Sequence, residues 1–126
     1  QVINMGSASG VYGVPHLASY SASKFAVRGL TEALDLEWAR HGIRVGDLMP
    51  PFVSTPMLNN QQFQAPVLQR LGVKLQAEDI AEAAWQQAHS SAVHRPVSLQ
   101  FKLMYWAGQL TPAWISRLIM RGLSRD

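Results

Sequence analysis

The 126-residue chain contains no cysteine, few charged side chains and no long apolar run. Without cysteine, disulfides and thiolate metal sites are excluded, and a reducing compartment is compatible. No apolar run is long enough to span a bilayer and no signal peptide precedes the first expected strand, so we expect a cytoplasmic protein. With 15% charged and 48% hydrophobic residues, the composition is that of one soluble globular domain.

Acidic residues are scarce at the end of the chain. Residues 1–101 balance seven basic against seven acidic side chains, so the net charge of +3 comes from residues 102–126. The tail's only acid is Asp126, and its basic residues are Lys102, Arg117, Arg121 and Arg125. A few arginines on one short helix do not make a nucleic-acid motif, so we expect no nucleic-acid partner.

The three tail arginines recur every four residues beside apolar side chains, which predicts a basic amphipathic helix. The apolar neighbours are Trp114, Ile115, Leu118 and Ile119. Such a helix either docks on its own domain or a partner subunit, with its arginines in water, or lies on an anionic membrane surface. We favour the docked position.

The four histidines show no metal-ligand spacing, and the sequence has no H-E-x-x-H motif, so we expect no metal site. They are His16, His41, His89 and His94, and we interpret them as solvated or loop residues. Asp47, near the end of an expected strand, is interpreted as a cap or turn former rather than a catalytic acid.

The first half of the chain predicts a strand, a helix and a second strand. A short apolar run ends at Met5, a glycine- and serine-rich loop covers 6–18, and a helical pattern starts near Ser19. His41-Gly42 ends that helix, and IRVGDLM (43–49) predicts the next strand. A βαβ unit of this length favours an α/β fold with a parallel sheet covered by helices.

The second half is interpreted as three further parts after the catalytic core at 1–53. Residues 54–73 predict an irregular substrate flap, whose Met57, Leu58, Phe63 and Leu68 favour an apolar compound. Within 74–106 we expect a helix at 77–89 and a strand at 97–106. Residues 107–126 contain the basic C-terminal helix, which begins after Pro112.

The stretch VINMGSASGVYG (2–13) has two interpretations. Gly6, Gly10 and Gly13 resemble a phosphate cradle, with Glu32 about twenty residues on. However, a cradle requires the helix to open directly from the glycines, and here the helical pattern starts several residues after Gly13. We therefore favour a loop that carries a catalytic side chain.

The candidate side chains are Ser7, Tyr20 and Lys24. On a helix, Tyr20 and Lys24 are four residues apart and share one face. A nearby cation favours the phenolate form of a tyrosine, which suits it to proton transfer at a carbonyl or alcohol oxygen. A serine hydroxyl can hold that oxygen while charge develops on it. Alternatively, Tyr20 simply packs at the helix start and Lys24 faces water.

Several segments resemble the C-terminal half of short-chain dehydrogenases/reductases. They are INMGSASG, YSASKFAVRGLTEAL, GIRV and MPPFVSTPM, in the family's order and spacing. The resemblance covers residues 1 to about 60, and more loosely the helix expected at 77–89. It implies a Rossmann-type, doubly wound parallel sheet, of which this chain is the second half.

The resemblance also implies an activity. Hydride would pass between NAD or NADP and a carbonyl compound or secondary alcohol. Ser7, Tyr20 and Lys24 match the family's catalytic residues, and Lys24 also binds the nicotinamide ribose. Pro50, Val53 and Thr55 match the segment that lines the nicotinamide. Family members usually pair through the long helix, which implies a homodimer or homotetramer.

The chain departs from the family in two respects. Pro51 stands where the family usually has glycine, which removes an N–H group. The phosphate-binding loop, the selector between NAD and NADP and a fourth catalytic residue, an asparagine, have no counterpart here. We expect that the chain is the C-terminal half of a longer reductase. The alternative is a catalytically silent binding or scaffold protein with the same fold.

Overall fold

The computed structural model describes residues 1–54, 66–72 and 75–123. Three strands form a parallel sheet in the order β1-β2-β3, with Val2 paired to Val45 and Asp47 paired to His94. The described helices and strands are β1 (Val2–Met5), η1 (Ala8–Gly10), α1 (Ala18–Trp38), η2 (Ala39–His41), β2 (Val45–Met49), α3 (Pro66–Leu71), α4 (Ala77–Ala88), β3 (His94–Pro96), α5 (Leu99–Leu110) and α6 (Ala113–Leu123).

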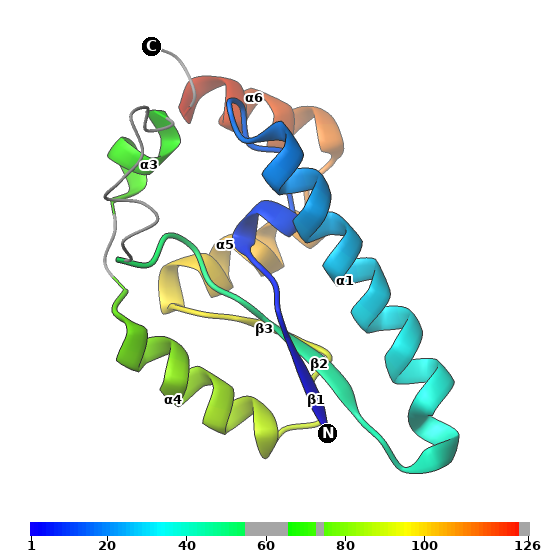
Figure 1. Cartoon of the computed structure of the whole chain (residues 1–126). Coiled ribbons are helices and arrows are strands. Elements are labelled where there is room, and N and C mark those ends of the chain that lie inside the picture. The colour runs from blue at the N-terminus through cyan, green and yellow to red at the C-terminus, as the bar shows by residue number, and fades with distance from the viewer. Residues whose placement is uncertain (55–65, 73–74, 124–126) are drawn as a thin grey trace.

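Helices cover both faces of the sheet, with α1 on one side and α4 on the other (Figure 1). The parallel α/β architecture predicted from the βαβ pattern is therefore confirmed. The predicted bounds of α1, β2 and α4 also agree closely with the structure, and the expected helix after Pro112 is α6. In α4 the expected acids of the first turn are present, and Asp79 accepts a hydrogen bond from the Gln76 backbone N–H.

The central strand β2 is buried along its whole length. On one face, Leu48 packs with Ala83 of α4 and with Val97. On the other face, Met49 packs with Phe101 and with Tyr105 of α5. Because side chains alternate along a strand, these two clusters lie on opposite faces of the sheet.

The strand predicted at 97–106 is wrong, because this segment forms α5. Its first seven residues, VSLQFKL, alternate between apolar and polar side chains, which is the pattern of a strand. The structure places the third strand just before it, at His94–Pro96. The Ser98 hydroxyl caps the helix by accepting a hydrogen bond from the Phe101 backbone N–H at 3.2 Å.

Part of the segment predicted to be irregular also forms a helix, α3. Proline suits the first helical position, because its missing N–H would have no partner there, and Pro66 occupies that position. The proposed flap residues Met57, Leu58 and Phe63 lie outside the described residues, and the role of 54–73 as a flap stays a prediction. Leu68 lies in α3.

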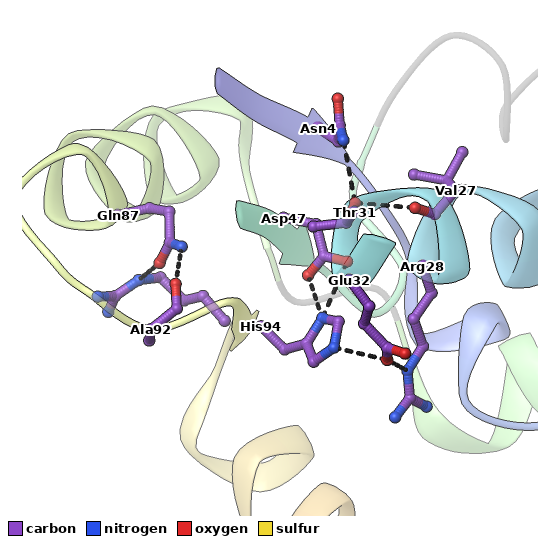
Figure 2. Close-up of polar contacts among 10 residues, drawn as sticks. Asn4, Val27, Arg28, Thr31, Glu32, Asp47, Gln87, Ala92 and His94 are labelled. Carbon is purple, nitrogen blue, oxygen red and sulfur yellow. Dashed lines mark hydrogen bonds and ion pairs between the residues drawn. The ribbon is translucent and has the colours of Figure 1, made fainter. Parts of the chain in front are cut away.

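A buried glutamine, Gln87 of α4, makes hydrogen bonds to residues outside its own helix. Its Oε1 accepts a hydrogen bond from Arg95 Nε at 2.8 Å, and its amide nitrogen donates to the Ala92 carbonyl (Figure 2). The Gln87 backbone carbonyl accepts a further bond from the Gln1 side chain at 2.9 Å. Gly46 of β2 lies directly beneath this side chain.

Gly46→Ala is expected to destabilise the protein by about 2 kcal/mol, because overpacking a core costs roughly 1–3 kcal/mol. The added methyl would lie 2.3 Å from Gln87 Nε2 and 3.0 Å from the Val93 carbonyl. Gly29→Ala is the matched control, because the new Cβ has nothing within 4 Å there. It should stabilise α1 by about 1 kcal/mol. Urea unfolding of both variants measures the difference, and an unchanged midpoint for Gly46→Ala would contradict the packing described.

Candidate active site

The candidate residues gather where the parallel strands β1 and β2 end. In open parallel sheets, ligands bind at the carboxyl ends of the strands. Ser7 follows β1, and Pro50 follows β2. The Ala8 backbone N–H donates a 2.9 Å hydrogen bond to the Pro50 carbonyl, so the two strand ends are tied together.

The loop after β1 lies directly against α1. A Cβ on Gly10 would be 2.8 Å from the Lys24 carbonyl, so only glycine allows this close approach without a shift. Farther along the loop, the Val14 backbone N–H donates to the Ser21 hydroxyl at 3.1 Å. These contacts bring the loop that carries Ser7 to the helix that carries Tyr20 and Lys24.

Ser7 is buried, and its hydroxyl oxygen accepts a 3.2 Å hydrogen bond from the Ser9 backbone N–H. A serine hydroxyl has one hydrogen to donate besides its acceptor lone pairs. Accepting from Ser9 fixes the oxygen and leaves that hydrogen to be donated to a ligand oxygen.

Lys24 reaches back from α1 to the end of β1. Its Nζ donates a 2.9 Å hydrogen bond to the Met5 carbonyl and lies 5.5 Å from the centre of the Tyr20 ring. The predicted pairing of these two side chains on one helix face is therefore seen in the geometry. An ammonium has three donors, so Lys24 keeps two for another partner while its position is held by the strand end.

The segment expected to line a nicotinamide is described only in part. Pro50 is buried, Val53 forms a bridge with Leu75, and the Ser54 backbone N–H donates to the Leu75 carbonyl at 2.9 Å. Thr55 lies outside the described residues.

A cavity of about 600 Å³ opens beside Ser7. Ligand pockets for small molecules fall in this size range. Most of its lining is apolar. The lining comes from the loop after β1, the segment after β2, α5 and α6, and includes Val11, Phe52, Met104, Ile119 and Met120. Tyr20 and Lys24 are not among the described lining residues, so only Ser7 of the three candidates faces this space.

A second polar cluster lies on the α1 face of the sheet (Figure 2). Asp47 of β2 is fully buried, and both of its carboxylate oxygens lie 3.1 Å from His94 Nδ1. The other ring nitrogen of His94 lies 2.9 Å from Glu32, which also pairs with Arg28 at 3.2 Å. Since both ring nitrogens face carboxylates, both must carry hydrogen, which is the imidazolium form.

The pKa shifts in this cluster agree with that assignment. The hydrogen bond to Asp47 raises the pKa of His94 above its ordinary value, although burial opposes it. Burial raises the pKa of Glu32, but hydrogen bonds from His94 and Arg28 outweigh it, so that the Glu32 pKa lies below its ordinary value. The cluster stabilises the attachment of β3 and α1 to β2.

These positions correct two sequence-based interpretations. His94 is neither solvated nor in a loop, because it lies in β3 and is bonded on both sides. Asp47 is neither a cap nor a turn residue, because it pairs with His94 inside the sheet. Across the described ranges we find no group of His, Asp or Glu that could hold a metal ion.

Comparison with known proteins places this geometry in a family. A model of the short chain dehydrogenases matches residues 1–65, which is more than half of the chain. The chain belongs to the short-chain dehydrogenase family. The family match contains Ser7, Tyr20, Lys24 and the segment after β2, and the described part of this family member has a parallel sheet with helices on both faces.

Individual relatives agree with this assignment. A short-chain dehydrogenase of Neurospora crassa is 38% identical over 89 residues, covering 65% of this chain and 33% of that protein. A short chain dehydrogenase of Burkholderia cenocepacia in complex with NADP has a TM-score of 0.73 at 24% identity, over 94% of this chain and 46% of that chain. One from Mycobacterium paratuberculosis bound to NAD has a TM-score of 0.59 at 30% identity, over 76% and 42%. The chain thus matches less than half the length of each of these proteins.

The His94 cluster predicts a pH-dependent stability. Because the folded-state pKa of His94 is raised, the protonated ring stabilises fully below the unfolded value of about 6.5 and this contribution is lost as the pH rises through the raised pKa. His94→Gln should therefore lower the free energy of unfolding more at about pH 6 than at about pH 9.

Urea unfolding at the two pH values measures this difference. His41→Gln, at an exposed position of η2, serves as the control and should show no such change. An equal loss at both pH values for His94→Gln would mean that the charged ring does not link Asp47 to Glu32.

Proposed function

We propose that this chain carries the catalytic part of an NAD(P)-dependent oxidoreductase that acts on an apolar ketone or secondary alcohol. The observation that carries the proposal is the placement of Lys24, which is bonded to the end of β1 and lies 5.5 Å from the Tyr20 ring. The loop bearing Ser7 meets the same helix through Gly10. The relatives' names as dehydrogenases support an oxidoreductase activity.

The residues present fit the nicotinamide end of the cofactor. Lys24 keeps two N–H donors for ribose hydroxyls, with Tyr20 beside it, and Pro50 and Val53 follow β2 at the same edge of the sheet. The described residues contain no glycine-rich turn that leads directly from a strand into a helix, where a pyrophosphate would bind. NADP and NAD in the related structures support a dinucleotide without deciding between the two.

In the proposed mechanism the nicotinamide supplies or accepts the hydride. Ser7 donates a hydrogen bond to the substrate oxygen, using the hydrogen that its contact with Ser9 leaves available. In reduction Tyr20 gives its phenolic proton to that oxygen, and in oxidation its phenolate takes the proton back. The Lys24 ammonium stabilises the phenolate and orients the ribose. Hydride and proton together convert a ketone to a secondary alcohol.

The cavity beside Ser7 supports an apolar substrate. Its walls are mostly apolar and its volume is about 600 Å³, so a ring or chain of carbon atoms would lose water contact on entering it. The carbonyl end of such a compound would face Ser7.

The expected homodimer or homotetramer stays a prediction. Three large apolar side chains of α1 are exposed, namely Phe25, Leu30 and Leu36. They offer a surface for pairing through the long helix, as the resemblance implies.

Tyr20→Phe is expected to lower the turnover of apolar ketones by about 10²–10⁴-fold, the usual contribution of a general acid. Binding of NADPH should be retained, because the ring and Lys24 remain. Consumption of NADPH measures turnover, and cofactor fluorescence measures binding. Turnover and cofactor binding are measured in this chain and in a version extended by an N-terminal, phosphate-binding half.

Turnover and cofactor binding, measured together, distinguish a wrong role for Tyr20 from a protein without catalytic activity. Full turnover by Tyr20→Phe would remove Tyr20 from the mechanism. Cofactor binding without turnover in the unsubstituted extended protein, or no binding of NADH or NADPH at all, would favour the silent scaffold instead.

Ser7→Ala should lower turnover by about 10²–10³-fold, as the loss of an oxyanion donor does.

A further inference from the structure

Helix α5 is apolar on two opposite sides. Phe101 and Tyr105 are buried against Met49. The opposite side presents a stripe at three- and four-residue steps, and its exposed fractions are 74% for Leu99, 65% for Leu103, 59% for Trp106 and 89% for Leu110. A helix that is apolar all round normally has an apolar environment on both sides.

Helix α6 also has an exposed side that carries apolar residues. Only Thr111 and Pro112 separate it from α5. Its inner side packs on the molecule, where Met120 and Leu123 contact the cluster around Val14. Its outer side presents Trp114, Arg117, Leu118 and Arg121, which share one helix face by their spacing, and all four are exposed. Helix α6 therefore docks on its own domain through its inner side and leaves Arg117 and Arg121 exposed, as favoured from the sequence.

We call these exposed residues the outer surface of α5 and α6. Its members are Leu99, Lys102, Leu103, Trp106, Leu110, Trp114, Arg117, Leu118 and Arg121. The sequence has no aspartate or glutamate between residues 83 and 125, so every formal charge on this surface is positive. In a symmetric dimer through this surface, like charges would face one another.

We propose that the outer surface of α5 and α6 docks on an anionic lipid bilayer. Apolar side chains, tryptophans and arginines on one helical surface are the combination that binds at the lipid headgroup level. Negatively charged lipid supplies the complementary charge that a second copy of the chain lacks. No helix in the described residues is long and apolar enough to cross a membrane.

The cavity lies beside the two helices that would contact the lipid, which gives membrane binding a role in substrate entry. Phe101, Met104, Ile119 and Met120 line the cavity from α5 and α6, while the outer surface belongs to the same two helices. Only the width of a helix, about 10 Å, would separate the cavity from the lipid. This consequence for substrate entry rests on the proposed function, whereas the docking itself does not.

The test is co-sedimentation of the protein with vesicles, using phosphatidylcholine alone and phosphatidylcholine mixed with phosphatidylglycerol. Binding is expected with the anionic vesicles, and it should weaken as salt is added. Arg117→Gln with Arg121→Gln should weaken binding roughly 30-fold, since each basic residue near an anionic surface contributes about one kcal/mol. Leu110→Ser should also weaken it. Arg40→Gln, at an exposed position of η2, should bind as well as the unsubstituted protein.

Tryptophan fluorescence tests the orientation without any turnover. With brominated lipid in the vesicles, a protein that keeps only Trp106 and Trp114 should be quenched. A protein that keeps only Trp38 and Trp85 should not be quenched.

Three outcomes would overturn the proposal. They are no binding to anionic vesicles, binding that the arginine substitutions leave unchanged, or a dimer in solution that does not bind vesicles and that Leu110→Ser dissociates. The last outcome would make a second copy of the chain the occupant.

Discussion

The central strand β2 is buried from Val45 to Met49, so both of its faces have to be covered by other parts of the chain. On the α4 side, Gly46 leaves room for Gln87, and Leu48 fills the space below Ala83. On the α1 side the strand carries a carboxylate, Asp47, that cannot be left unpaired in the core. His94 from the neighbouring strand supplies the partner, and Glu32 from α1 holds the outer side of that ring.

The candidate active site depends on this packing because it is built where β1 and β2 end. The Ala8 to Pro50 hydrogen bond joins the two strand ends, and Lys24 extends from α1 to the last residue of β1. The Lys24 contact requires α1 to stay against the sheet, and the His94–Glu32 contact also joins α1 to the sheet. The residues with structural roles, Arg28 and Glu32, and those with proposed chemical roles, Tyr20 and Lys24, therefore lie on the same helix, about one to three turns apart.

Most of the fold could be predicted because the pattern in each segment is local. The apolar periodicity of α1 and α4, the stop at His41-Gly42 and the short run of β2 all lie within a few residues. The four segments INMGSASG, YSASKFAVRGLTEAL, GIRV and MPPFVSTPM, in that order and spacing, were specific enough to indicate the family that the comparison confirms. For α5 the local pattern was misleading, since its alternating first residues describe a strand equally well.

The His94 cluster could not have been found from spacing. Asp47 and His94 are 47 residues apart and meet only because β2 and β3 are paired in this register. In the same way, the outer side of α6 is exposed because Met120 and Leu123 on its inner side contact the cluster around Val14. That contact joins residues far apart in the sequence, so the pattern of α6 alone does not reveal it. The cavity beside Ser7 is likewise formed by segments that are far apart in the chain, which no single motif describes.

The central claim is that the carboxyl ends of β1 and β2 hold the reacting end of a nicotinamide cofactor. Mapping of backbone amide chemical shifts during addition of NADPH tests it most directly. The account predicts the largest changes at Ser7, Tyr20, Lys24 and Val53, with little change at Gln87. Changes concentrated at Gln87 and α4, or unchanged amides at Ser7, Tyr20 and Lys24 with saturating cofactor, would contradict it.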